Sequence, residues 1–294
     1  MRVFVTGASG HIAWAVIPEL LQAGHQVVGL ARSDESAVAV QALGAEVRRG
    51  DLGDTAGLRE AASEADAVIH LAFRHDLLAT GDMAGAAATD LTVVRAFGDA
   101  LAGTGKTLIG VGLARPADAP GASPRSAVAR EAAGLTGRGV RSMLVAIPPV
   151  VHGPRDRQGF IPTLISIARA AGGSGYVGDG GNHWPAAHAL DVGRLYRLAL
   201  EKAPAGAQLF AAAEEGIPVR EIAEAIGRHL DVPAVSVPAA EVAGHFGWFA
   251  PFITMDVTFS SDDTQRLLDW KPEHPGLIAD LDHGHYFTTT PQPG

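Results

Sequence analysis

Short apolar runs alternate with amphipathic stretches through the first half of the chain. Runs rich in β-branched residues predict six strands, at 2–7, 26–32, 45–51, 66–73, 106–114 and 141–151. Apolar residues at three- and four-residue spacing predict helices between them, at 11–25, 36–44, 55–65, 83–101 and 124–136. Because nearly continuous apolar strands that alternate with helices are typical of a covered parallel sheet, we expect an α/β fold with a doubly wound parallel sheet.

The alternation loosens after Gly153, where prolines and glycines become frequent. A further helix is predicted over about 191–203, and we expect it to return to the sheet. The chain should therefore form a nucleotide-binding domain and a smaller C-terminal substrate lobe. The expected boundaries are 1–153 for the first domain with a return segment at about 186–213, and 154–185 with 214–294 for the substrate lobe.

Composition narrows the possible functions of this chain of 294 residues. Its net charge of −9 argues against nucleic acid or an anionic membrane as a partner. The absence of cysteine excludes disulfides, thiolate metal ligands and cysteine nucleophiles. Apolar runs are too short to span a membrane, and the N-terminus begins directly with a strand pattern, so we expect a cytoplasmic protein.

The segment TGASGHIA, residues 6–13, follows the first strand and precedes the first helix. Gly7 permits a tight turn, Gly10 lets the backbone approach a pyrophosphate, and Ala13 takes the place of a third glycine. The helix dipole and unpaired amides attract phosphate at such a turn. The predicted cofactor contacts here are Gly7, Ser9, Gly10, His11 and Ile12.

The end of the second strand indicates which dinucleotide is bound. An acidic residue there would bind the ribose 2′-hydroxyl of NAD, but Arg32 and Ser33 occupy the place. A guanidinium and a hydroxyl suit a 2′-phosphate, so we expect NADP in preference to NAD. The remaining predicted cofactor contacts are Asp51 and Leu52 at the adenine, and Leu71, Ala72 and Phe73 near the ribose and nicotinamide.

Together, the motifs TGASGHIA, GDL, HLAF, PPVVHGP and SSDDTQRLLDWKP resemble the extended and atypical short-chain dehydrogenase/reductase group, the NAD-dependent epimerase/dehydratase-like superfamily. The resemblance implies a Rossmann domain that holds NAD(P) and a C-terminal lobe that closes over a small-molecule substrate. It also implies a homodimer joined through two helices per subunit. Ala-rich helices expected near 86–102 and 125–137 suit such an interface.

The usual catalytic residues of that group are missing. The group uses a Tyr-x-x-x-Lys pair with a Ser or Thr at the end of the fifth strand. Arg125 stands at the tyrosine position and Ala129 at the lysine position, and residues 110–114 contain neither Ser nor Thr. The three tyrosines, Tyr176, Tyr196 and Tyr286, all come after the sixth predicted strand.

Other polar and aromatic residues are therefore candidates for the chemistry. Arg125 and His152 are the expected catalytic residues, and the expected substrate contacts are His75, His183, Trp184 and Trp248. For His188 and Asp191 we expect a structural hydrogen bond. We predict no metal, because HExxH spacing is absent and the pair His283 and His285 lacks a clear third ligand.

These features favour an atypical NADPH-dependent reductase of a small activated substrate with a conjugated C=C or a C=N bond. Such a substrate needs less acid assistance than a plain carbonyl, so activity on ordinary ketones should be poor. Two alternatives remain open. One is a non-redox isomerase, cyclase or lyase on the same scaffold, and the other is a protein that senses NADP(H) by binding it.

Overall fold

The computed structural model describes residues 1–114 and 123–288, and the chain forms two compact units. Unit 1 comprises Met1–Ile147, Val192–Ala211 and Ser261–Lys271. Unit 2 comprises Pro148–Asp191, Ala212–Ser260 and the segment from Pro272 onward. Each unit has its own sheet and its own apolar core. Among the described residues, no helix is both long and apolar enough to cross a membrane.

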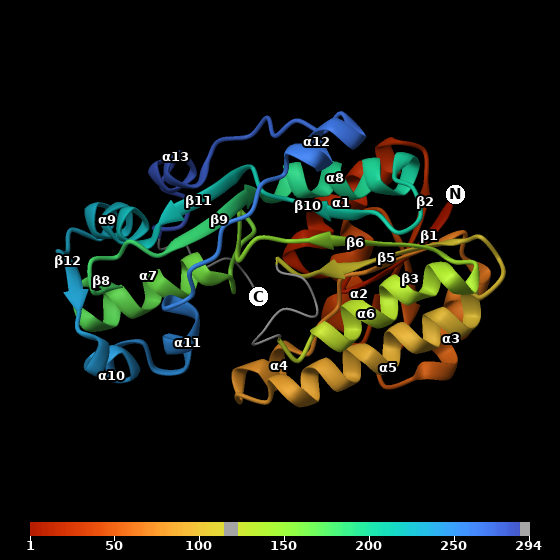
Figure 1. The fold of residues 1–294 in the computed structure, drawn as a ribbon, viewed down its shortest axis with the longest axis horizontal. Coiled ribbons are helices and arrows are strands. Elements are labelled where there is room, and N and C mark those ends of the chain that lie inside the picture. The colour runs from red at the N-terminus through yellow and green to blue at the C-terminus, as the bar shows by residue number, and fades with distance from the viewer. Residues whose placement is uncertain (115–122, 289–294) are drawn as a thin grey trace. The chain divides into compact units, whose positions relative to one another are not determined.

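Unit 1 is built on a seven-stranded parallel sheet with the order β10-β6-β5-β4-β1-β2-β3 (Figure 1). Its strands are β1 (Arg2–Thr6), β2 (Gln26–Ala31), β3 (Glu46–Arg49), β4 (Ala67–His70), β5 (Thr107–Gly112), β6 (Arg141–Ala146) and β10 (Gln208–Phe210). The expected doubly wound parallel fold is confirmed. The direction of winding reverses between β1 and β4, and in such sheets ligands bind at the carboxyl ends of the strands beside this point.

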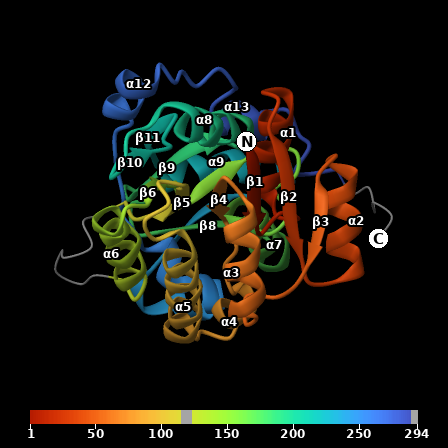
Figure 2. The ribbon, with the colours of Figure 1, turned by 90° about the vertical axis from the view of Figure 1, so that its right-hand side faces the viewer.

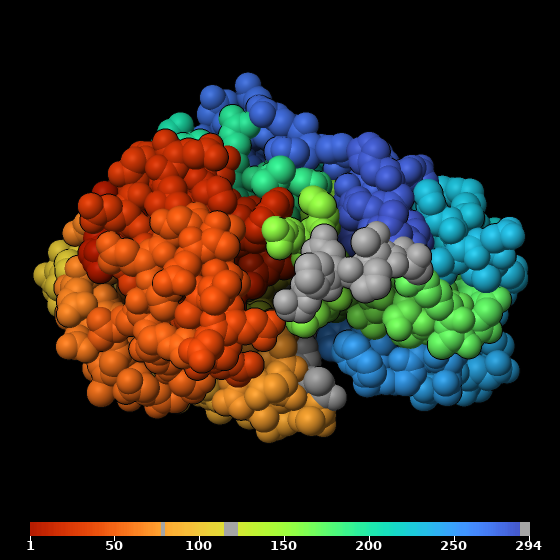
Figure 3. All heavy atoms as spheres, turned by 180° about the vertical axis from the view of Figure 1, so that it is seen from behind, coloured from red at the N-terminus to blue at the C-terminus, as the bar shows by residue number. Residues whose placement is uncertain are grey.

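Helices cover both faces of this sheet. They are α1 (His11–Gln22), α2 (Asp34–Ala42), α3 (Thr55–Glu64), α4 (His75–Ala79), α5 (Met83–Leu101), α6 (Ser126–Gly134), α8 (Ala189–Lys202) and α12 (Asp262–Leu268). Helices α3, α5 and α6 lie side by side over one face (Figure 2), where Phe4, Phe97 and Leu108 form part of the core. Helix α8 meets α1 so closely that a Cβ on Gly193 would lie 2.7 Å from the Ala15 backbone. Figure 3 shows the N-terminal part of unit 1, in red and orange, as a continuous surface of atoms.

Two expectations about the chain's organisation need correction. The run 141–151 is not one strand, because β6 ends at Ala146 and β7 (Val150–His152) belongs to a different sheet. Pro148 and Pro149 lie between them and lack the amide hydrogens that a central strand needs. The segment Ser261–Lys271, expected in the substrate lobe, belongs to unit 1, where the Phe210 amide donates to the Thr264 hydroxyl at 2.7 Å.

Unit 2 combines a three-stranded sheet, ordered β11-β9-β7, with a two-stranded sheet of β12 and β8. Its further strands are β8 (Ser174–Val177), β9 (His183–His188), β11 (Glu214–Pro218) and β12 (Ala234–Val237). Its helices include α7 (Phe160–Ala171), α9 (Val219–Leu230), α10 (Val242–Phe246), α11 (Ala250–Ile253) and α13 (Leu277–Asp282). The core contains Trp184, whose ring packs against Phe160 and Phe249.

Candidate cofactor and active site

The glycine turn of unit 1 passes directly over the end of β4. Gly7 has φ +66°, and a Cβ there would lie 2.7 Å from the Ala72 backbone nitrogen. The Gly10 amide closes the turn by donating to the Gly7 carbonyl at 2.9 Å. Helix α1 then begins at His11, without a side-chain cap or an acidic residue in its first turn. The backbone amides in the first turn of α1 and the helix dipole can therefore hold an anion.

Two basic residues lie where the ribose phosphate was expected. Arg32 is exposed just after β2, whereas the Ser33 hydroxyl already caps α2 by accepting from the Ser36 amide. Arg49 ends the neighbouring strand β3, and its guanidinium donates to the Ser33 carbonyl and the Asp34 carboxylate. Sequence reasoning missed Arg49. Its position at the end of β3, the strand paired with β2, could have identified it.

Asp51 and Leu52, the expected adenine contacts, have local structural roles. The Asp51 carboxylate accepts from the Gly53 amide at 2.8 Å and so shapes the turn after β3. Leu52 is half-buried against the core. Their contact with an adenine stays a prediction.

A buried polar network connects the glycine turn to helix α5. The Thr6 hydroxyl lies 2.6 Å from His70 Nδ1, and His70 Nε2 lies 2.8 Å from the Asp90 carboxylate. Because an ionised carboxylate only accepts, His70 donates to Asp90 through Nε2, while its Nδ1 shares a hydrogen bond with the Thr6 hydroxyl. That hydroxyl also accepts from the Ala72 amide at 3.3 Å. The network therefore satisfies three polar side chains beside the cofactor turn.

Arg125 is fixed at the far end of this Thr6–His70–Asp90 network. Its guanidinium lies 3.4 Å from the second Asp90 oxygen and stacks 4.7 Å from the centroid of Phe73. Burial alone would raise the pKa of Asp90, but the His70 hydrogen bond and the charges of His70 and Arg125 outweigh it and lower that pKa. Arg125 is 24% exposed, and its Nε is buried without a hydrogen-bond partner among the described residues. One donor of a fixed cation is thus left unpaired.

Asp90 was not anticipated, although its position carried a signal. Helix α5 buries Ala87, Val94 and Phe97 on one face, and Asp90 lies on the same face with 4% exposure. A carboxylate on an apolar stripe needs a partner, since an unpaired buried charge is costly. The partners lie on β4 and before α6, and the helix pattern alone could not identify them.

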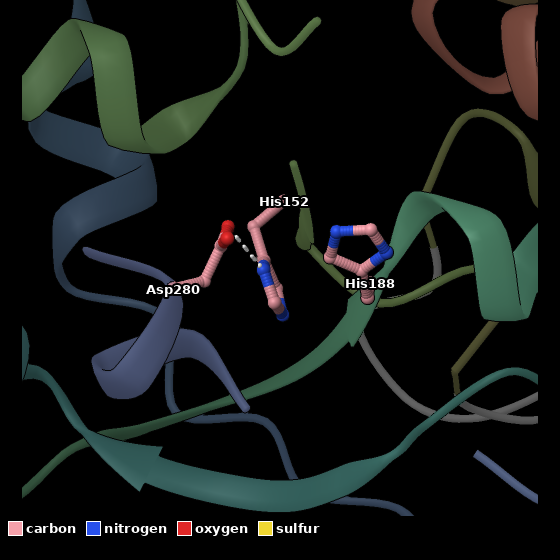
Figure 4. Close-up of side chains that lie close together, drawn as sticks. All are labelled: His152, His188 and Asp280. Carbon is pink, nitrogen blue, oxygen red and sulfur yellow. Dashed lines mark hydrogen bonds and ion pairs between the residues drawn. The ribbon is translucent and has the colours of Figure 1, made fainter. Parts of the chain in front are cut away.

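Unit 2 brings together His152, His188 and Asp280 (Figure 4). His152 Nδ1 lies 2.8 Å from the Asp280 carboxylate, and its Nε2 is buried without a partner. Burial lowers the pKa of His188 to about 4, with the nearby His152 acting in the same direction. Burial would raise the pKa of Asp280, but the hydrogen bond and charge of His152 outweigh it and lower that pKa. His152, expected as a catalytic residue, is thus held inside unit 2.

Several predicted site residues prove to have other surroundings. Trp184 is fully buried and donates to the Met255 carbonyl, so it is a core residue rather than a pocket wall. Trp248 is 57% exposed, and His183 lies half-exposed beside Asp256. Together with His75, whose ring meets the edge of Phe73 in unit 1, they stay candidates for substrate contact.

The expected bond between His188 and Asp191 is replaced by other contacts. Asp191 accepts from His274 at 2.9 Å and from the backbone amides of Glu273 and His274. His188 instead accepts from the Leu190 amide at 3.3 Å. Each side chain thus bonds to a group other than the partner that the sequence predicted.

We expect Asp156 to make the stability of unit 2 depend on pH. It is 7% exposed, accepts from Gly159 and Tyr286, and burial raises its pKa to about 6. Because the folded state binds this proton more tightly than the unfolded chain, the stabilisation is present below about pH 4 and is lost as the pH rises through 6. Relative to Asp156→Asn, we expect the wild type to lose up to about 3 kcal/mol of unfolding free energy across this window. Urea unfolding at a series of pH values measures it, and a relative gain by the wild type would contradict the assignment.

Comparison with known proteins supports the interpretation of unit 1. Residues 7–115 match a family model described as NAD(P)H-binding. An uncharacterized protein of Schizosaccharomyces pombe is 40% identical over 299 residues, covering 98% of this chain and 100% of that protein. The 4-hydroxy-2-methyl-3-oxo-4-farnesyl-3,4-dihydroquinoline-1-oxide ketoreductase of Stigmatella aurantiaca is 29% identical, over 84% of this chain and 80% of its own. The UDP-glucose 4-epimerase of Thermus thermophilus, solved with NAD, shares the fold with TM-score 0.74 and 19% identity, covering 99% of this chain and 100% of that one.

Proposed function

We propose that the chain is a member of the epimerase/dehydratase-like superfamily of short-chain dehydrogenases/reductases and an NADPH-dependent reductase of a small activated substrate, because residues 7–115 match an NAD(P)H-binding family model. The observation that carries the proposal is Arg125, a cation held by Asp90 whose Nε has no hydrogen-bond partner in the described part of the chain. By the resemblance, Arg125 stands at the position of the family's tyrosine. Bound NADPH would supply the hydride, water would supply the proton that completes the reduction, and the residues of the chain would bind and polarise the substrate.

Arg125 is suited to stabilise negative charge that develops on a substrate oxygen. A guanidinium stays charged at every working pH, so it acts as an electrostatic donor rather than as a proton donor. Asp90 and Phe73 hold it before substrate arrives, which reduces the cost of reorganisation in the transition state. Phe73 follows Leu71 and Ala72, which the glycine turn approaches, so Arg125 lies near the turn that we propose holds the cofactor.

The missing Tyr-x-x-x-Lys pair defines the substrate class that we propose. A general acid contributes roughly 10²–10⁴-fold, so a site without one favours a substrate that accepts hydride readily. A conjugated C=C or a C=N bond is activated in this way, and its developing charge can be spread toward Arg125. The ketoreductase name of the Stigmatella relative supports a reduction without identifying this substrate.

We propose a preference for NADPH that rests on Arg32 and Arg49, although the epimerase with the same fold was solved with NAD. Arg32→Ala and Arg49→Ala should each weaken NADPH by about 10- to 100-fold and NADH by much less, because a charge-assisted phosphate contact is worth ~1.5–3 kcal/mol. Fluorescence titration of the two cofactors measures this difference.

Arg48→Ala is the matched control, because Arg48 precedes Arg49 on β3 but pairs with Glu60 and Glu64. It should leave both affinities unchanged. Equal affinity of the wild type for NADPH and NADH would show that the phosphate assignment is wrong.

The experiment that tests the function supplies NADPH and a panel of enones, cyclic imines, β-keto esters and simple ketones. We expect oxidation of NADPH with one of the activated classes and little with simple ketones. Efficient turnover of simple ketones would contradict the proposed substrate class. Conversion of a compound without any change in nicotinamide absorbance would favour a non-redox enzyme instead.

A further inference from the structure

We propose that His152, His188 and Asp280 bind one divalent transition-metal ion of the Zn²⁺ class in unit 2. One ligand atom from each side chain lies within 4.8 Å of the other two, and all three residues are buried. The proposal replaces the sequence-based expectation of no metal. It does not depend on the proposed reductase activity, because the site lies in unit 2 and needs neither substrate nor nicotinamide for its test.

The backbone itself positions the two imidazoles. Strands β7 and β9 are parallel, and their register places His152 directly opposite His188. Side chains at paired positions on neighbouring strands project from the same face, so the two rings face one space. Helix α13 brings Asp280 to the same place (Figure 4). Regular secondary structure therefore supplies all three groups, which is the rigid placement that a metal site requires.

His152 presents one ring nitrogen to the carboxylate. Its Nδ1 lies 2.8 Å from the Asp280 oxygen, so these are the atoms of the two side chains that can share one ion. An ion placed between them would take the place of the present hydrogen bond. His152 Nε2 points away from Asp280, and it is buried without a hydrogen-bond partner among the described residues. Nδ1 is therefore the His152 nitrogen that we assign to the ion.

His188 supplies the second nitrogen at the cost of one weak contact. Its Nδ1 accepts from the Leu190 amide at 3.3 Å, and the other nitrogen lies on the side toward His152 in Figure 4. Metal at that nitrogen would move the ring proton to Nδ1 and end this long contact. The His188 ring is meanwhile held by stacking on His274, with the centroids 4.7 Å apart.

The donor set selects the class of ion. Two imidazoles and one carboxylate are typical of Zn²⁺ and Fe²⁺ sites, whereas Mg²⁺ and Ca²⁺ prefer oxygen ligands alone. A fourth position is available to His285, whose Nε2 is buried, has no hydrogen-bond partner in the described part of the chain and lies 3.8 Å from the Asp280 carboxylate. The three principal ligand atoms need to move closer together by small side-chain adjustments as the ion binds.

Titration of the untagged, chelator-treated protein with Co²⁺ tests the site. Tetrahedral Co²⁺ with nitrogen ligands absorbs visible light far more strongly than aqueous Co²⁺. We expect a visible band that saturates at one equivalent per chain and is abolished by added Zn²⁺. Bound metal should also raise the thermal unfolding midpoint, because it binds the folded state alone. A wild type that shows no such band overturns the proposal.

Variants assign the band to these residues. His188→Ala should weaken Co²⁺ by at least about 100-fold, and Asp280→Asn by about 10- to 100-fold. His229→Gln is the matched control, since His229 also bonds an aspartate of unit 2, Asp282, at 3.0 Å but lies outside the cluster. Circular dichroism confirms folding of each variant, and Asp280→Asn decides the assignment if His188→Ala unfolds. A band that persists in the folded variants, or disappears in His229→Gln, overturns the proposal.

Discussion

Replacement of Arg125 by alanine should lower kcat/KM for the activated substrate by about 10²–10³-fold. The guanidinium stacks on Phe73 and is bound by Asp90, so it is already oriented before the reaction. Loss of one such preorganised donor removes stabilisation that is strongest in the transition state, and kcat should fall more than KM changes. Affinity for NADPH should remain close to that of the wild type. Steady-state kinetics and cofactor titration measure both quantities.

Two further variants separate electrostatic catalysis from a general effect of charge. Arg125→Lys keeps the charge but loses the planar guanidinium, which stacks on Phe73 and can donate two hydrogen bonds at once. This variant should therefore recover only part of the rate. Arg95→Ala removes another arginine of unit 1, which pairs at the surface with Glu131, and should retain full activity. If Arg125→Ala keeps full kcat/KM on the true substrate, Arg125 has no role in the reaction.

Asp90→Asn should destabilise the protein by about 2–4 kcal/mol. Asp90 is 4% exposed and accepts from both His70 and Arg125, so the folded network contains a negative charge that both partners require. An asparagine side chain has one acceptor oxygen, so its NH₂ group would face one of the two donors, His70 or Arg125. Chemical denaturation of the wild type and the variant at neutral pH measures the difference in unfolding free energy.

Asp99 provides a control on the same helix. It pairs with Arg59 and Arg138, but its side chain is 50% exposed. Exposed ion pairs contribute about 0–1 kcal/mol, so Asp99→Asn should have a small effect. Equal losses for Asp90→Asn and Asp99→Asn would show that the buried network is not the source of the stabilisation.

The sequence predicted the elements that local patterns determine. The six strands were located to within a few residues except at Pro148 and Pro149, and the glycine turn occupies its expected place after β1. Gly7 illustrates why, since a positive φ and a close backbone approach leave room for no other residue. The positive φ is a local requirement, and a glycine at that position of the sequence indicates it directly.

The polar networks could not be predicted in the same way. Thr6 and His70 are 64 residues apart, and His152 and Asp280 are 128 apart, so each pair depends on the tertiary fold. The missing HExxH spacing was likewise no guide to His152 and His188, because strand register rather than a helix brings them together. The homodimer stays a prediction, since a single chain carries no information about a partner subunit.

Transfer of deuterium from C4-deuterated NADPH tests the proposed function most directly. The substrate is the panel compound in whose presence the protein oxidises NADPH. Wild-type protein is incubated with this compound and one C4 epimer of the labelled cofactor at a time. The product is then analysed by mass spectrometry. Hydride transfer predicts one deuterium in the product from one epimer, and a strongly reduced rate of its appearance with Arg125→Ala. A protein that binds NADPH and converts the compound without incorporating deuterium from either epimer would contradict the reductase assignment.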